Sequence, residues 1–154
     1  MNNLGKLIGV IILAAMVIGY FGTREKVGDY NSYVGKLRPV LLRQDSILVE
    51  IQQSEDSEVA EKVDGWLERS DACLADFQKI APDDAEIAGL HRNLIERAEA
   101  MSKGLRSLKL WAQSQDEKDM EEFARQMALA ESALDSFITQ RNAYFKKHDM
   151  TLDE

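Results

Sequence analysis

Apolar residues recur along most of this chain in alternating steps of four and three, the spacing of a packed helical seam. Four consecutive segments keep this rhythm, and each is long enough for a helix. The seam positions are Tyr30, Val34, Leu37, Leu41, Gln44, Leu48 and Ile51; Val59, Val63, Trp66, Ser70, Cys73, Phe77 and Ile80; Ile87, His91, Leu94, Ala98, Met101, Leu105, Leu108 and Ala112; and Met120, Phe123, Met127, Ala130, Leu134, Phe137, Arg141 and Tyr144. The pattern predicts four helices around one core.

The connections between these helices are short. Pro82-Asp83-Asp84 predicts the end of one helix and the cap of the next, and Asp116 predicts the N-cap of the last helix. Short connections favour antiparallel neighbours, so the predicted fold is an all-α, coiled-coil-like up-down four-helix bundle. The small residues Ala98, Ala112 and Ala130 indicate that the last two helices approach closely.

The N-terminal segment has a different pattern, because residues 7–23 carry no charge. With Leu4 and Gly5 the apolar stretch reaches about 19 residues, or roughly 28 Å of helix, close to the hydrocarbon thickness of a membrane. We therefore expect a transmembrane signal-anchor helix over 1–22. The alternative is a cleaved signal peptide, with Val17 and Gly19 at the −3 and −1 positions.

Two small-xxx-small spacings occur within this span, Gly5/Gly9 and Ala15/Gly19. Such spacings let two transmembrane helices pack closely, although glycine is also common in membrane helices that do not pair. Residues 23–39 are expected to form a hinge, because they contain Gly28, Gly35 and Pro39. The bundle is expected over 40–148, with a helix start as early as 30, followed by a polar tail over 149–154.

Composition and charge exclude several classes of function. Good helix formers dominate after residue 55, and the 27 acidic residues outnumber the 19 basic ones. An acidic bundle with interspersed charges does not suit nucleic-acid binding, which needs a basic face. A single cysteine excludes an intramolecular disulfide and a cysteine-based zinc site.

No motif for catalysis or cofactor binding is present in the sequence. Carboxylate-bridged metal bundles need Glu-x-x-His pairs, but Glu86 and His91 are five residues apart and His148 has no glutamate three before it. We therefore expect no enzyme activity, no metal and no cofactor. Candidate interaction residues are His91, a pH-sensitive group or a hydrogen-bonded core histidine, and Arg141, which either pairs with an acid or faces a partner.

The stretch that begins at Ile80 reads IAPDDAEIAGLHRNLIERAEAMSKGLRSLKLWAQSQDEKDMEEFARQMALAESALDSF. It resembles uncharacterised, single-pass, membrane-anchored helical-bundle proteins of bacterial envelopes, with a proline-acid loop, an early histidine and an alanine-spaced last helix. The resemblance implies a single-pass protein of the bacterial inner membrane. An N-terminal anchor favours an extracytoplasmic bundle, whereas Arg24, Lys26, Lys36 and Arg38 after the span favour a cytoplasmic one.

Two functions fit these features. The first is a membrane-tethered, non-enzymatic interaction or scaffold module, an accessory subunit of an envelope complex, whose contacts are the lipid bilayer and a protein partner or a second copy. The second is a sensory or ligand-binding bundle that acts through a partner, with an unknown small-molecule ligand.

Overall fold

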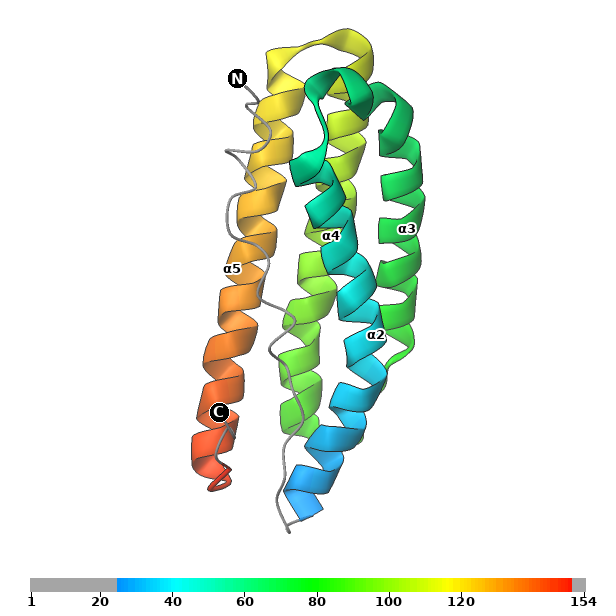
Figure 1. Ribbon diagram of the computed structural model, residues 1–154. Helices are drawn as coiled ribbons and strands as arrows, with labels where there is room; N and C mark the ends of the chain where they lie inside the picture. The colour runs from blue at the N-terminus through cyan, green and yellow to red at the C-terminus, as the bar shows by residue number, and fades with distance from the viewer. Residues whose placement is uncertain (1–24, 151–154) are drawn as a thin grey trace.

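The computed structural model describes residues 25–150 as four long α-helices and no strand. The helices are α2 (Glu25–Gln53), α3 (Val59–Lys79), α4 (Ala85–Ser114) and α5 (Glu117–Lys147), with a short 3-10 helix η2 (Asp56–Glu58) before α3. They run up and down, so each long helix is antiparallel to the next one in sequence (Figure 1). The predicted all-α four-helix bundle is confirmed for this part of the chain.

The predicted helix caps of α4 and α5 are confirmed. The carboxylate of Asp84 accepts hydrogen bonds from the backbone N–H groups of Glu86 and Ile87 at 2.8 and 3.0 Å. Asp116 accepts from the N–H of Lys118 at 3.0 Å. Each carboxylate satisfies donors that a helix N-terminus leaves unpaired. Asp84 and Asp116 therefore fix where the two longest helices begin.

The seam positions lie in the core almost throughout. On α3 the side chains from Val59 to Phe77 at the predicted spacing are all buried. The exceptions lie near helix ends, where Ile80, Ala112, Met120 and Arg141 remain partly exposed. Burial of the apolar positions contributes about 1.5–3 kcal/mol for each large side chain. The four-three rhythm thus identified the core faces correctly.

The junction expected over residues 23–39 differs from the structure. From Glu25 onward the chain is helical through Pro39 to Gln53, with no break in this range. Val27, Tyr30 and Tyr33 are buried, so this part of α2 belongs to the bundle. Proline removes only one backbone donor from the helix, and packing of these large side chains outweighs that loss.

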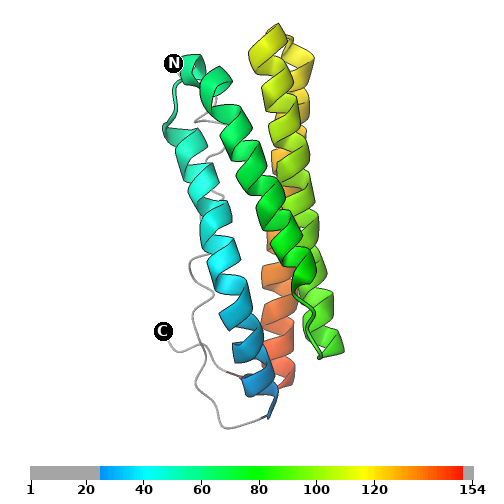
Figure 2. The same cartoon turned by 90° about the vertical axis from the view of Figure 1, so that its right-hand side faces the viewer.

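The α4–α5 pair is the closest in the bundle, as the small seam residues predicted (Figure 2). Ala98 and Ala130 are fully buried. At Gly104 a Cβ atom would lie 2.6 Å from Met127 Cε and 3.2 Å from Gln126 Cβ. The absence of a side chain at Gly104 is what permits α5 to approach at this level.

The core consists of two apolar clusters with a polar layer between them. The cluster nearer the start of α2 includes Leu37, Phe77 and Phe137, and the other includes Trp66 and Phe123. Between them lie buried polar side chains from three helices, which we call the polar layer: Gln44 and Asp45 on α2, Ser70 on α3, and Arg97 and Ser102 on α4.

Candidate functional site

Arg97 is the central residue of the polar layer. Its side chain is completely buried, and it donates from Nη1 to Gln44 Oε1 at 2.5 Å and from Nη2 to Asp45 Oδ1 at 3.0 Å. Ser70 and Ser102 share a hydrogen bond of 3.0 Å in the same layer. The guanidinium therefore holds α2 to α4, and the serine pair holds α3 to α4.

The hydrogen bonds at Arg97 leave some buried polar atoms without a protein partner. Gln44 Nε2, Asp45 Oδ2 and Arg97 Nε each lack a hydrogen bond to any protein atom. A buried polar atom without a partner costs about 1–3 kcal/mol. Burial also raises the pKa of the Asp45 carboxyl, because the loss of solvation outweighs the attraction and hydrogen bond of Arg97. The polar layer is thus an incompletely satisfied interface between α2 and α4.

His91, one of the two candidate interaction residues, is buried where α2, α3 and α4 meet. Its Nε2 donates to the carbonyl oxygen of Phe77 at 2.7 Å, so its Nδ1 accepts from the Tyr33 hydroxyl at 3.1 Å. Burial lowers the pKa of His91, and the bond to the Phe77 carbonyl opposes this shift to a smaller extent. The neutral imidazole fits both bonds, and burial favours this form.

Arg141, the other candidate, lies on α5 at the end of the bundle where α2 begins. Its guanidinium donates to Asn142 Oδ1 and lies 5.8 Å from the centre of the Phe145 ring. Phe145 in turn packs edge-on against Tyr30 at 4.8 Å between ring centres. Arg141 is partly exposed at the rim of an aromatic cluster that joins α2 to α5.

The opposite end of the bundle has a concentration of negative charge. Two segments lie at that end, residues 53–64 around η2 and residues 110–122 around the α4–α5 turn, and we call them together the acidic tip (Figure 1). They contain ten carboxylates and two lysines, a formal charge of −8, while acidic and basic residues balance in the rest of the sequence. The net charge of the chain thus resides at one end of the bundle.

The acidic tip also has apolar side chains at its surface. Leu110 is 52% exposed. Trp111 and Met120 are packed only partly against the core. Large apolar side chains surrounded by charges are the usual composition of a protein-binding patch, with tryptophan enriched among the residues that contribute most to affinity.

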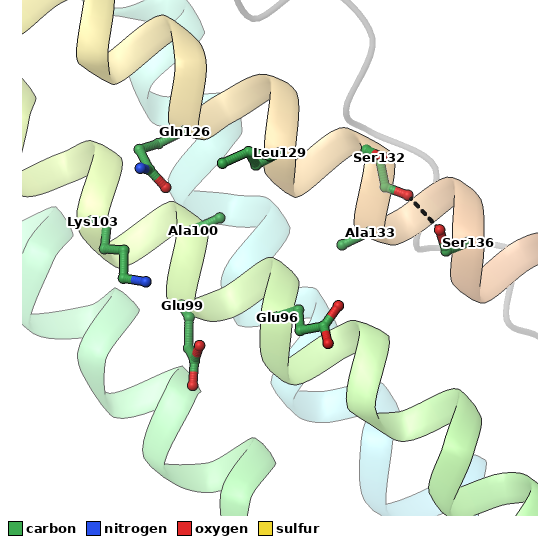
Figure 3. A pocket seen from close by; sticks show the side chains of 9 residues that line it. All are labelled: Glu96, Glu99, Ala100, Lys103, Gln126, Leu129, Ser132, Ala133 and Ser136. Carbon is green, nitrogen blue, oxygen red and sulfur yellow. Dashed lines mark hydrogen bonds between the residues drawn. The ribbon is translucent and has the colours of Figure 1, made fainter.

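A groove of about 320 Å³ runs between α4 and α5. Figure 3 shows Ala100 on α4 and Ala133 on α5, with Lys103, Glu96 and Glu99 on the α4 side. The remaining lining residues are Gln126, Leu129, Ser132 and Ser136. The Ser136 hydroxyl is bound to the Ser132 carbonyl at 2.9 Å, and no histidine lines the groove. The groove offers space for a side chain of a partner.

The other residues considered from the sequence are placed as follows. Cys73 is buried under α2, with its Sγ 4.0 Å from the carbonyl oxygen of Val40. The predicted membrane helix, including Gly5, Gly9, Ala15 and Gly19, lies outside the described residues. Among residues 25–150, no helix is long and apolar enough to cross a membrane, and no three metal-ligating side chains come together.

Sequence reasoning missed Arg97 as a core residue. A second line of buried positions runs along α4 through Leu90, Leu94, Arg97 and Met101 to Gly104, again in steps of four and three. Because α4 packs against α3 and α5 and reaches α2 as well, it buries more than one stripe. A charged residue inside this second apolar stripe was the signal that could have identified the polar layer.

Comparisons with protein-family models, with curated proteins and with solved structures find no match to this chain.

Proposed function

We propose that this chain is a membrane-tethered, non-enzymatic interaction module whose acidic tip binds a basic protein partner. The observation that supports this best is the confinement of a net charge of −8 to one end of the bundle. In this proposal residues 7–23 span the bacterial inner membrane and the bundle lies on the extracytoplasmic side, as an accessory or scaffold subunit of an envelope complex.

The distance between the two ends of the bundle supports a membrane tether at one end and a binding surface at the other. α5 has 31 residues, and at ~1.5 Å rise per residue it is about 45 Å long. The Debye length at physiological salt is about 8 Å, so charges at the tip are screened from those at the start of α2. The negative electrostatic potential at the tip is therefore set by the tip itself, and it attracts a basic surface of a partner.

The acidic tip suits a protein partner better than a metal ion or a nucleic acid. Its carboxylates repel phosphates, and within the described residues they form no metal-ligating cluster. Several carboxylates already have local partners, such as Glu122, whose pKa is lowered to about 2 mainly by hydrogen bonds from Arg125 and Gln126. The exposed remainder lies in the same two segments as Leu110 and Trp111, so the tip has both negative charge and accessible apolar side chains.

The test compares two variants of the full chain that change the same amount of charge. The tip variant carries Asp56→Asn, Glu61→Gln, Glu117→Gln and Glu121→Gln. The control variant carries Glu68→Gln, Asp83→Asn, Glu131→Gln and Asp135→Asn. All eight side chains are exposed. The amount of partner that co-purifies from solubilised membranes is measured for each variant against the unchanged chain, at low and high salt.

We expect the tip variant to lose most of its partner, and the control variant to retain it. Binding by the unchanged chain should fall as salt is raised, because the attraction is electrostatic. Equal losses in both variants, or binding insensitive to salt, would contradict the assignment of the tip as the binding surface.

A further inference from the structure

The buried polar atoms that lack a protein partner are concentrated at one helix. Among the described residues these atoms belong to five side chains, Tyr30, Gln44, Asp45, Arg97 and His148. The first three are on α2, and Arg97 faces α2 through its hydrogen bonds to Gln44 and Asp45. His148 Nε2 lies within 3.4 Å of a Glu86 carboxylate oxygen, at ion-pair distance. The unpartnered buried groups therefore either belong to α2 or lie beneath it.

The backbone packing of α2 is also the loosest in the bundle. α5 runs close along α4, and α3 packs on α4 over much of its length, whereas the backbone of α2 approaches mainly α3. α2 reaches α4 and α5 through side chains, namely the bonds of Arg97 and the ring contact of Tyr30 with Phe145. Figures 1 and 2 show α2 lying along α3 at the side of the bundle away from α5 over most of its length. α3, α4 and α5 thus form a better-packed unit without α2.

Within α2 itself, backbone features reduce its intrinsic helix stability. Gly28 and Gly35 have open space where a Cβ would lie, so packing does not require glycine at either position. Each glycine disfavours helix relative to alanine, and Pro39 in the helix interior does so more strongly. α2 therefore depends on its packing for its structure more than α4 or α5 does.

Apolar burial keeps α2 in place in the ground state. Leu37, Ile47, Leu48 and Ile51 are completely buried. The burial of these four side chains, together with the other apolar residues of α2, holds the helix in place against the unpartnered polar atoms. Separation of α2 is consequently a rare event, but every polar atom of its interface regains water when it occurs.

We infer that α2 is a displaceable strap, which detaches from α3–α4–α5 through the polar layer while those three helices stay folded together. The opening exposes the apolar inner face of the three-helix unit, including Phe77 and Leu94, to solvent. This inference rests only on residues 25–150 and stands apart from the proposed function.

Cys73 provides a direct probe of the opening, because it is the one cysteine of the sequence. It is buried beneath α2, against the Val40 carbonyl. Burial raises the pKa of the Cys73 thiol, which makes it unreactive in the closed bundle. Modification of this thiol by a disulfide reagent, measured on the full chain in mild detergent over a range of urea concentrations, reports the population of open molecules.

We expect labelling of Cys73 through an opening at least about 100-fold more populated than global unfolding, with a urea dependence clearly smaller than that of global unfolding. Amide hydrogens of α2 should exchange through the same opening, while those of α4 and α5 stay protected. Two results would overturn the inference. The first is that Cys73 is labelled only on global unfolding, with the full urea dependence. The second is that the amides of all four helices exchange as one unit.

A variant with an apolar layer tests the cause of the opening. Replacing the layer on both helices (Arg97→Met, Gln44→Leu and Asp45→Leu) removes the unpartnered atoms and should slow Cys73 labelling by about tenfold or more. The control, Ser70→Ala with Ser102→Ala, changes the same layer away from α2 and should leave the rate within about twofold. Faster labelling in the apolar variant would contradict the polar layer as the cause of the opening. Amide hydrogen exchange in the unchanged chain still decides whether α2 opens.

Discussion

Arg97 and Asp45 form an ion pair inside the bundle, with Nη2 3.0 Å from Oδ1 and side chains 0% and 9% exposed. A buried pair of this kind contributes little net stability, because desolvation of both charges offsets their attraction. Once both charges are buried, however, removal of one leaves the other uncompensated. The pair therefore makes the bundle sensitive to single changes in the polar layer.

The first prediction concerns this sensitivity. Arg97→Ala should lower the free energy of unfolding by about 3–5 kcal/mol at neutral pH, because the Asp45 carboxylate loses its partner. This loss of unfolding free energy should become smaller as the pH falls, since Asp45 takes up a proton in the folded variant. Denaturant unfolding followed by circular dichroism measures both effects. The double variant Arg97→Ala with Asp45→Asn should recover part of the loss, and a double variant as unstable as the single one would refute this explanation.

The second prediction concerns His91. Burial lowers its pKa below 6.5 in the folded chain, so the unfolded chain binds a proton more readily in acid. The stability that this histidine contributes is fully present above pH 6.5 and is lost as the pH falls toward its folded pKa, with a slope of at most about 1.4 kcal/mol per pH unit. Unfolding free energies between pH 7.5 and 5 should show this decline.

His91→Leu should remove the decline, and His148→Gln serves as the control that keeps it. The carboxylates whose pKa values are lowered, such as Glu50 and Glu86, lose their contribution below about pH 4.5 and lie outside this range. An unchanged pH profile in His91→Leu would assign the decline to other groups.

The third prediction uses two glycines of the same helix. Gly104→Val should destabilise the chain by about 1–3 kcal/mol, because the new side chain meets Met127 and Gln126 where α4 and α5 are closest. At Gly89 nothing lies within 4 Å of the Cβ position, so Gly89→Val should change the stability by less than about 0.5 kcal/mol. Thermal unfolding of the two variants compares them directly, and equal effects would count against close packing at Gly104.

The fourth prediction concerns the tether. The full chain should stay with the membrane pellet after alkaline extraction, because residues 7–23 are uncharged and apolar. Ile12→Asp with Met16→Asp should move it to the supernatant, since each charge at the centre of a membrane helix costs about 2.5–3.5 kcal/mol. The conservative control, Ile12→Leu with Met16→Leu, should remain in the pellet. Release of the unchanged chain would rule out a membrane-spanning segment.

The fold was largely predictable from the sequence, because the seam spacing and the aspartates at residues 84 and 116 report local properties of helices. The start of α2 was not, because the glycines and Pro39 that indicate a hinge are outweighed by tertiary burial of Tyr30 and Tyr33. Local propensity is a weak guide where packing decides.

The candidate sites were harder to predict than the fold. Gln44 stood out as a polar seam position, but its partner Arg97 depends on which face of α4 meets α2, a property of the assembled bundle. The acidic tip comes from two segments about 50 residues apart, and neither has a run of like charges long enough to stand out. Both features require knowledge of which residues meet in space.

Photo-cross-linking in intact membranes tests the central claim most directly. A photoreactive residue is placed either at Glu117 in the acidic tip or at Asp83, which is also exposed but lies in the α3–α4 connection at the other end. We predict a discrete protein adduct from position 117, reduced at high salt, and no such adduct from position 83. The same adducts from both positions, or no protein adduct from the tip, would contradict the account.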